Sequence, residues 1–159
     1  MVYDKDIINR HNQKHMASCI PSCVEMILKL LGKVHIDYYD LQDEWNNKAD
    51  GSFANFDKKT IYDVTFHREF NQQRGVNSPI DELFERIDRE LQDGRFVCVS
   101  LCSNDGWHMY VIHKRTNGDY AAFSKGGQNG QETIEVTDVR QKVTNMRGTD
   151  ILTYSLSAE

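Results

Sequence analysis

Cys19 is the residue of this chain best placed to act as a nucleophile. Apolar residues recur at steps of three and four from position 19 to position 31, which predicts a helix that begins at Cys19. Unpaired backbone N–H groups and the helix dipole stabilise negative charge at a helix N-terminus, so they lower the pKa of a thiol there. We therefore predict a reactive thiolate at Cys19 and packed, unreactive thiols at Cys23, Cys98 and Cys102.

A thiol nucleophile needs a proton acceptor, and His108 has the best context of the six histidines. It follows the turn-like segment 104–107 and begins a predicted strand, so it is held rigidly and can still face a cleft. Gln13 precedes Cys19 by six positions and could donate to a developing oxyanion together with the Cys19 backbone N–H. A lone cysteine or histidine in such a place is more often structural, and it is the combination that indicates a catalytic site.

The elements that must position these residues follow from the hydrophobic pattern. Helical spacing recurs at 37–45 and 79–91, and Ser78 is the expected cap of the second of these helices. Between 46 and 77 the pattern dissolves into a polar stretch with room for one short helix, either a specificity insertion or plain scaffold. Asn117-Gly118 predicts a hairpin turn. The predicted strands cover 96–101, 108–114, 119–124, 133–137 and 151–156, with one helical turn at 139–143.

This order of elements, helices first and an antiparallel sheet after them, predicts a single α+β domain over residues 1–159. The chain carries 19 basic and 24 acidic side chains, a net charge of −5, without a basic stripe. Neither nucleic acid nor a membrane surface is therefore an expected partner. No apolar run approaches the roughly 20 residues that span a bilayer, and the polar N-terminus is unlike a signal peptide. The cysteine spacing does not match common zinc sites, so no metal and no other cofactor is expected.

Two segments of the chain resemble papain-like cysteine peptidases, most closely the C39 group, which processes double-glycine leader peptides. The first is Gln13, a five-residue spacer, and Cys19-Ile20-Pro21-Ser22-Cys23 at the start of an apolar helix. The second is the strand-like run from Gly94 to Leu101, a short turn, and Gly106-Trp107-His108 leading into the next strand. The resemblance covers roughly residues 13–32 and 79–127. It implies a papain-like fold in which Cys19 attacks, His108 transfers the proton and Gln13 binds the oxyanion.

The chain departs from the C39 pattern at two positions. Ile20 stands where the family has glycine, and it is expected to narrow the cleft beside the thiol. The family also has an Asp or Asn about 16 residues after the histidine, and the corresponding residue here is Ser124. We predict that the Ser124 hydroxyl accepts the imidazole N–H of His108. The competing hypothesis is that Asp138 or a backbone carbonyl holds the ring.

The resemblance implies a cysteine endopeptidase that cleaves protein or peptide substrates after a Gly-Gly motif. Related domains also form the toxic tips of bacterial secreted effectors, which makes an inhibitory immunity protein an expected partner. The expected location is the cytoplasm, either of the cell that makes the protein or of a target cell that receives it. Two alternatives stay open: a deamidase or acyltransferase that uses the same Cys–His pair, and a catalytically degenerate peptide-binding domain.

Overall fold

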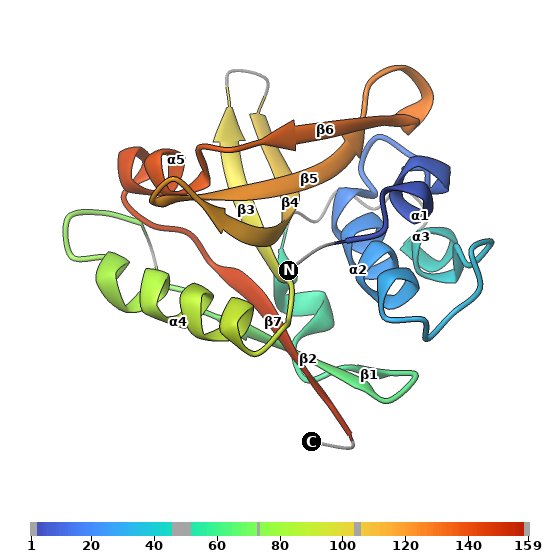
Figure 1. The fold of residues 1–159 in the computed structure, drawn as a ribbon, viewed down its shortest axis with the longest axis horizontal. Helices are drawn as coiled ribbons and strands as arrows, with labels where there is room; N and C mark the ends of the chain where they lie inside the picture. Colours follow the sequence, from blue (N-terminus) through green and yellow to red (C-terminus); the bar gives the residue numbers. More distant parts are fainter. Residues whose placement is uncertain (1–2, 46–51, 73, 104–105, 158–159) are drawn as a thin grey trace.

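One antiparallel sheet of seven strands, in the order β1-β2-β7-β3-β4-β5-β6, forms the centre of the protein (Figure 1). The computed structural model describes residues 3–45, 52–72, 74–103 and 106–157. The strands are β1 (Thr60–Ile61), β2 (Val64–Glu69), β3 (Val97–Ser103), β4 (Gly106–Thr116), β5 (Asp119–Gly126), β6 (Glu132–Val136) and β7 (Ile151–Leu156). The helices are α1 (Lys5–Arg10), α2 (Cys19–Leu30), α3 (Asp40–Trp45), α4 (Ile80–Gln92) and α5 (Val139–Met146), with 3-10 turns η1 (Phe53–Phe56) and η2 (Gln128–Gly130). The predicted α+β class is confirmed.

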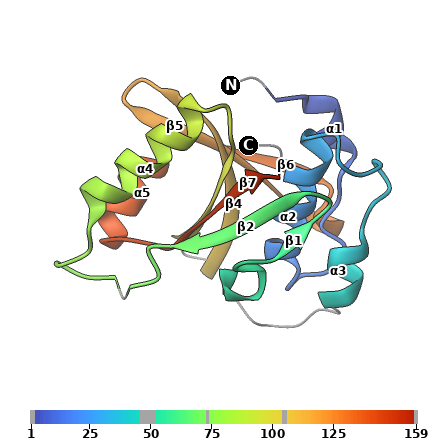
Figure 2. The same ribbon diagram turned by 90° about the horizontal axis from the view of Figure 1, so that it is seen from below.

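The helices form two groups with the sheet between them. Figure 2 shows α4 and α5 on one side and α1, α2 and α3 on the other. Each group has its own apolar core against the sheet, one built around α2 with Met109 and Phe123, the other around α4 and α5 with Val99 and Ile112. Within the described residues, no helix is both long enough and apolar enough to span a bilayer.

Helix α2 is the most deeply buried element, because every residue from Ile20 to Lys29 is buried. Its apolar side chains pack on β4 and β5, and α1 and α3 cover its other flank. Gly32 follows the helix with φ +70°, the left-handed conformation of a C-terminal glycine cap. The predicted helix 19–31 is thus confirmed, and its burial fixes the direction of the Cys19 end relative to the sheet.

The β4–β5 hairpin is the second element that positions the site. Asn117 and Gly118 form its turn with φ +51° and +79°, and the register pairs Thr116 with Asp119. Two successive positive φ angles are typical of a two-residue hairpin turn. A bulge between Ile112 and Lys114 shifts the register further along the hairpin. The predicted strands at 96–101, 108–114, 119–124, 133–137 and 151–156 all appear.

Several details of the sequence prediction were wrong. The stretch 46–77 contains strands β1 and β2 besides the short helix η1, and residues 46–51 and 73 lie outside the described residues. Helix α1 was not predicted, and α3 begins at Asp40 rather than at position 37. Ser78 does not cap α4: its N-cap is Pro79, and no side-chain cap bond is present there. Strands β1 and β2 come before α4 in the chain, so helices and strands alternate more than the predicted order implied. Strand β2 pairs with β7.

Candidate active site

Cys19 is the first residue of α2, and three backbone N–H groups lie around its sulfur. They belong to Cys19 itself, to Ile20 and to Met109 of β4, and each of them stabilises the thiolate. The side chain of the N-cap residue Ser18 makes no hydrogen bond to the N–H groups of the first helical turn. Its hydroxyl instead lies 2.8 Å from the His15 carbonyl oxygen and 2.9 Å from Gln42 Oε1.

Burial nevertheless outweighs these N–H groups. Removal from water raises the pKa of the Cys19 thiol to about 11, and the neighbouring Cys23 acts in the same direction. The expectation that the helix N-terminus lowers the pKa of Cys19 is therefore wrong for the resting protein. The free-energy cost of burying a thiolate at this position is larger than the stabilisation that the N–H groups at the helix end provide. Cys19 is a neutral thiol at pH 7 and needs a base that removes its proton during attack.

His108 is held by a short chain of hydrogen bonds that fixes its tautomer. Its Nε2 lies 2.8 Å from Ser124 Oγ, and Ser124 Oγ lies 2.6 Å from the Met109 carbonyl oxygen. The carbonyl can only accept, so the single hydroxyl proton of Ser124 is donated to Met109. With that proton on Met109, Ser124 accepts from His108, which puts the imidazole proton on Nε2 and leaves Nδ1 unprotonated. The predicted hydrogen bond between Ser124 and His108 is present.

The surroundings of His108 favour the neutral imidazole and contact its ring. Burial lowers the pKa of His108, and a backbone hydrogen bond at Lys125 acts in the opposite direction. The edge of the Tyr110 ring meets the imidazole at a centroid distance of 5.3 Å and an angle of 81°. Of the competing candidates for orienting the ring, Asp138 is instead an ion-pair partner of Lys142 at 3.9 Å. A backbone carbonyl, that of Lys125, does contact the ring besides Ser124. No hydrogen bond joins Cys19 and His108 in this resting state, as is common before substrate binds.

Gln13 reaches the same cavity as His108, but its amide has other partners. Its Nε2 donates to the carbonyl oxygens of His15 and Met16, at 3.0 and 3.1 Å, and thereby closes the loop before α2. Its Oε1 is buried and has no partner among the described residues. Both amide hydrogens are therefore used inside the loop. A role for Gln13 as an oxyanion donor stays a prediction and requires the amide to turn, whereas the Cys19 N–H is already at the sulfur.

Gln42, a residue that the sequence analysis missed, holds the loop that carries Gln13 through hydrogen bonds to its backbone. Gln42 is fully buried and uses both ends of its amide. Its Oε1 accepts from the Lys14 N–H at 2.7 Å, and its Nε2 donates to the Asn12 carbonyl at 2.9 Å and to Glu25 Oε1 at 2.7 Å. The signal in the sequence that could have indicated its role is that Gln42 is a polar residue next to the buried Leu41 in a short helix.

A cavity of about 420 Å³ opens at the candidate site. It is lined by the Gln13 loop, by Trp107 and His108, and by the glycine-containing turn after β5. Two large apolar side chains at its rim are exposed, Met16 at 94% and Trp107 at 45%. Both side chains are available to contact an apolar group of a ligand bound in the cavity. Ile20 does not narrow this cavity, contrary to the sequence prediction, because its side chain is 1% exposed and packs in the core.

The remaining cysteines and histidines lie outside the cavity or at its edge. Cys23 and Cys98 are buried as predicted, but Cys102 is exposed, which corrects the expectation of a packed thiol. His113 points away from the site and packs its ring against Tyr3 at 4.6 Å. His11 is buried against α2, and His15 lies at the rim of the cavity. Within the described part of the chain, no three His, Cys, Asp or Glu residues are arranged to hold a metal ion.

Comparison with protein families, with characterised proteins and with solved structures found no match for this chain. Function is therefore inferred from the geometry of the site and from the motif resemblance. Ser124 on β5 bonds to His108 on β4, and the backbone of Met109, the residue after His108, lies near the sulfur of Cys19 at the start of α2. Cys19 itself is not among the residues that line the cavity of His108. Such an arrangement can perform nucleophilic attack by sulfur with a neutral imidazole as the general base.

Proposed function

We propose that this chain is a cysteine peptidase with a papain-like arrangement of nucleophile and base. The observation that carries the proposal is the hydrogen-bond chain from His108 Nε2 through Ser124 Oγ to the Met109 carbonyl. It leaves Nδ1 as the only basic nitrogen of a neutral ring. The backbone N–H of the same Met109 lies at the sulfur of Cys19, so β4 contributes to both halves of the site.

The proposed reaction follows from the two neutral side chains. As the Cys19 sulfur bonds to the substrate carbonyl carbon, its proton moves to His108 Nδ1, and the negative charge on the carbonyl oxygen is stabilised by the Cys19 N–H. His108 then returns the proton to the leaving amine as the C–N bond breaks. A water molecule attacks the thioester in the same manner, with His108 again taking its proton, and releases the acid and the free thiol.

The finer parts of the proposal depend on the resemblance to the C39 group. They are cleavage after Gly-Gly, action as a bacterial toxin or effector in the cytoplasm of a target cell, and control by an immunity protein. Ile20 no longer supports the Gly-Gly preference, because its side chain is in the core. The exposed Met16 and Trp107 beside His108 support a peptide substrate in more general terms.

The test is a search for new protein N-termini in cells that express the protein. We expect wild-type chain to generate a set of new N-termini, and Cys19→Ala and His108→Ala each to abolish it while the fold is retained. Cys102→Ala removes an exposed thiol on β3 that pairs across the sheet with Trp107 but does not line the cavity of His108, and it should leave the set unchanged. Identical N-termini for wild type and Cys19→Ala would refute peptidase activity. Conversion of substrate Gln to Glu without cleavage, dependent on Cys19, would identify a deamidase instead.

A further inference from the structure

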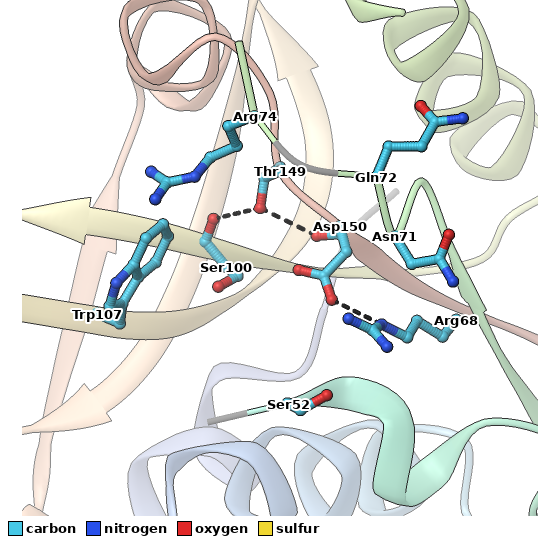
Figure 3. Close-up of a pocket in the computed structure, with 9 residues that line it drawn as sticks. All are labelled: Ser52, Arg68, Asn71, Gln72, Arg74, Ser100, Trp107, Thr149 and Asp150. Carbon is cyan, nitrogen blue, oxygen red and sulfur yellow. Dashed lines mark hydrogen bonds and ion pairs between the residues drawn. The ribbon is translucent and has the colours of Figure 1, made fainter. Parts of the chain in front are cut away.

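A second cavity of about 510 Å³ shares Trp107 with the cavity that contains His108. Figure 3 shows Trp107 and Arg74 on one side of it, Asp150 and Arg68 on the other, and Ser100 between them. The cavity thus begins one residue from the proposed general base.

Arg74 presents an uncommitted positive charge to this cavity. Its guanidinium carbon lies 4.2 Å from the centre of the Trp107 ring. Stacking uses the flat face of a guanidinium and leaves its N–H edge free for an acceptor. Among the residues that the structure describes, no carboxylate pairs with Arg74. Trp107 therefore orients this side chain without neutralising it.

Arg68 adds a second guanidinium that is only partly used. Its Nε donates to Asp150 Oδ2 at 3.0 Å, and both side chains are about three-quarters buried, with exposures of 26% and 21%. This contact occupies one of the five N–H donors of an arginine and leaves the two terminal nitrogens. Arg68 and Arg74 together carry two positive charges against the one negative charge of Asp150. The cavity is therefore positive in a protein whose net charge is −5.

Ser100 supplies a hydroxyl at the base of the same cavity. The residue is 7% exposed, and its Oγ has no hydrogen-bond partner among the described residues. Its backbone carbonyl, by contrast, accepts from Thr149 Oγ1 at 2.7 Å, so Thr149 is already committed (Figure 3). The Ser100 Oγ faces the open space of the cavity and is available there to a bound group.

We propose that this cavity is a subsite for a carboxylate of the substrate, bound by Arg74 with Arg68 and Ser100. Guanidinium groups recognise carboxylates through paired N–H donors, and the Ser100 hydroxyl can donate to the same group. The inference rests on the proposed function, since it concerns the substrate of the same site. The carboxylate lies within the first few residues on one side of the scissile bond, because Trp107 borders both cavities.

Binding is the first test, because it does not depend on catalysis. The probes are pairs of peptides that differ only by Glu or Gln at one position, titrated into the Cys19→Ala protein while the tryptophan fluorescence, to which Trp45 and Trp107 both contribute, is followed. We expect the best Glu peptide to bind roughly tenfold more tightly than its Gln partner, the effect of one charge-assisted hydrogen bond. Arg74→Gln should remove this difference between the Glu and Gln peptides.

Arg140→Gln is the matched control, because Arg140 stacks on Phe84 at 4.3 Å in the same way but lies outside the cavity. It should keep the full preference for Glu. Peptides that end at the tested position distinguish a chain terminus from an acidic side chain as the source of the carboxylate. Equal binding of every Glu and Gln pair, or a preference that survives Arg74→Gln, would overturn the proposal. Glu-selective binding without any cleavage by the wild type would uphold the subsite and reject the peptidase.

Discussion

Removal of the Ser124 hydroxyl isolates the feature on which the proposed mechanism depends. Ser124→Ala leaves two groups without their partner, the Nε2–H of His108 and the carbonyl of Met109, at a residue that is 1% exposed. An unmet buried hydrogen bond typically costs about 1–3 kcal/mol. One such loss, about 1–2 kcal/mol, acts on the orientation of the imidazole, which corresponds to a decrease in kcat/KM of roughly 5- to 30-fold. This is less than the loss of His108, which removes the base altogether.

The assay for this prediction separates a catalytic effect from simple destabilisation. Nitrogen NMR of His108 reports the tautomer directly, and we expect the proton on Nε2 in the wild type and a mixture of tautomers in Ser124→Ala. Thr153→Ala is the matched control, since it removes a hydroxyl that is also 1% exposed and bonds to Glu69 at 2.8 Å, away from the site. It should reduce stability without changing the His108 tautomer. A wild-type ring protonated on Nδ1, or unchanged kinetics in Ser124→Ala, would refute the reasoning.

Three further predictions concern the loop before α2 and the buried charges. Gln13→Ala should lower kcat by about tenfold or less, because its amide closes the loop; a decrease of 100- to 1000-fold in steady-state kinetics would show that the amide turns to the oxyanion. Gln42→Ala should lower the free energy of unfolding by about 2–4 kcal/mol in urea titrations, while the exposed Gln92→Ala should change it by less than about 0.5 kcal/mol. Unfolding should also become easier as the pH falls from 6.5 to 5, because burial lowers the pKa of His11 and of two other histidines, so the unfolded chain binds more protons. Each such histidine lowers the free energy of unfolding by up to about 1.4 kcal/mol per pH unit as the pH falls. Glu25, whose pKa burial raises to about 7, binds its proton in the folded state first and offsets the effect of one histidine. A free energy of unfolding that rises on acidification would contradict this balance.

The elements that the sequence predicted well are those with a strong local signal. The apolar spacing after Cys19 defined α2, and Asn117-Gly118 defined the turn that returns Ser124 to His108. Counting along a regular hairpin was sufficient for this contact although a bulge between Ile112 and Lys114 shifts the register, because Ser124 stays within hydrogen-bond distance of His108.

The features that the sequence did not predict depend on tertiary contacts. Strand β2 has a polar, irregular sequence and exists because it pairs with β7, more than 80 residues later. The pKa of Cys19 depends on how deeply α2 is buried under β4, which outweighs the local effect of the helix end. The direction of the Ile20 side chain likewise follows from the core around α2 and not from its place beside the nucleophile.

The carboxylate subsite shows the same limit. Arg68, Arg74, Ser100 and Trp107 come from four separate segments, and no spacing in the sequence connects them. Arg74 and Trp107 meet only because the segment before α4 lies against the start of β4.

The central claim is that Cys19 is a nucleophile activated by His108, and covalent trapping tests it most directly. The protein is incubated at pH 7 with a mixture of peptidyl vinyl sulfones that differ in the two residues before the reactive group, and the adduct is located by mass spectrometry. We predict one adduct, on Cys19, whose rate of formation decreases at least 100-fold in His108→Ala and is unchanged in Cys102→Ala. An adduct on Cys102 ahead of Cys19, or modification of Cys19 at the same rate without His108, would contradict the account.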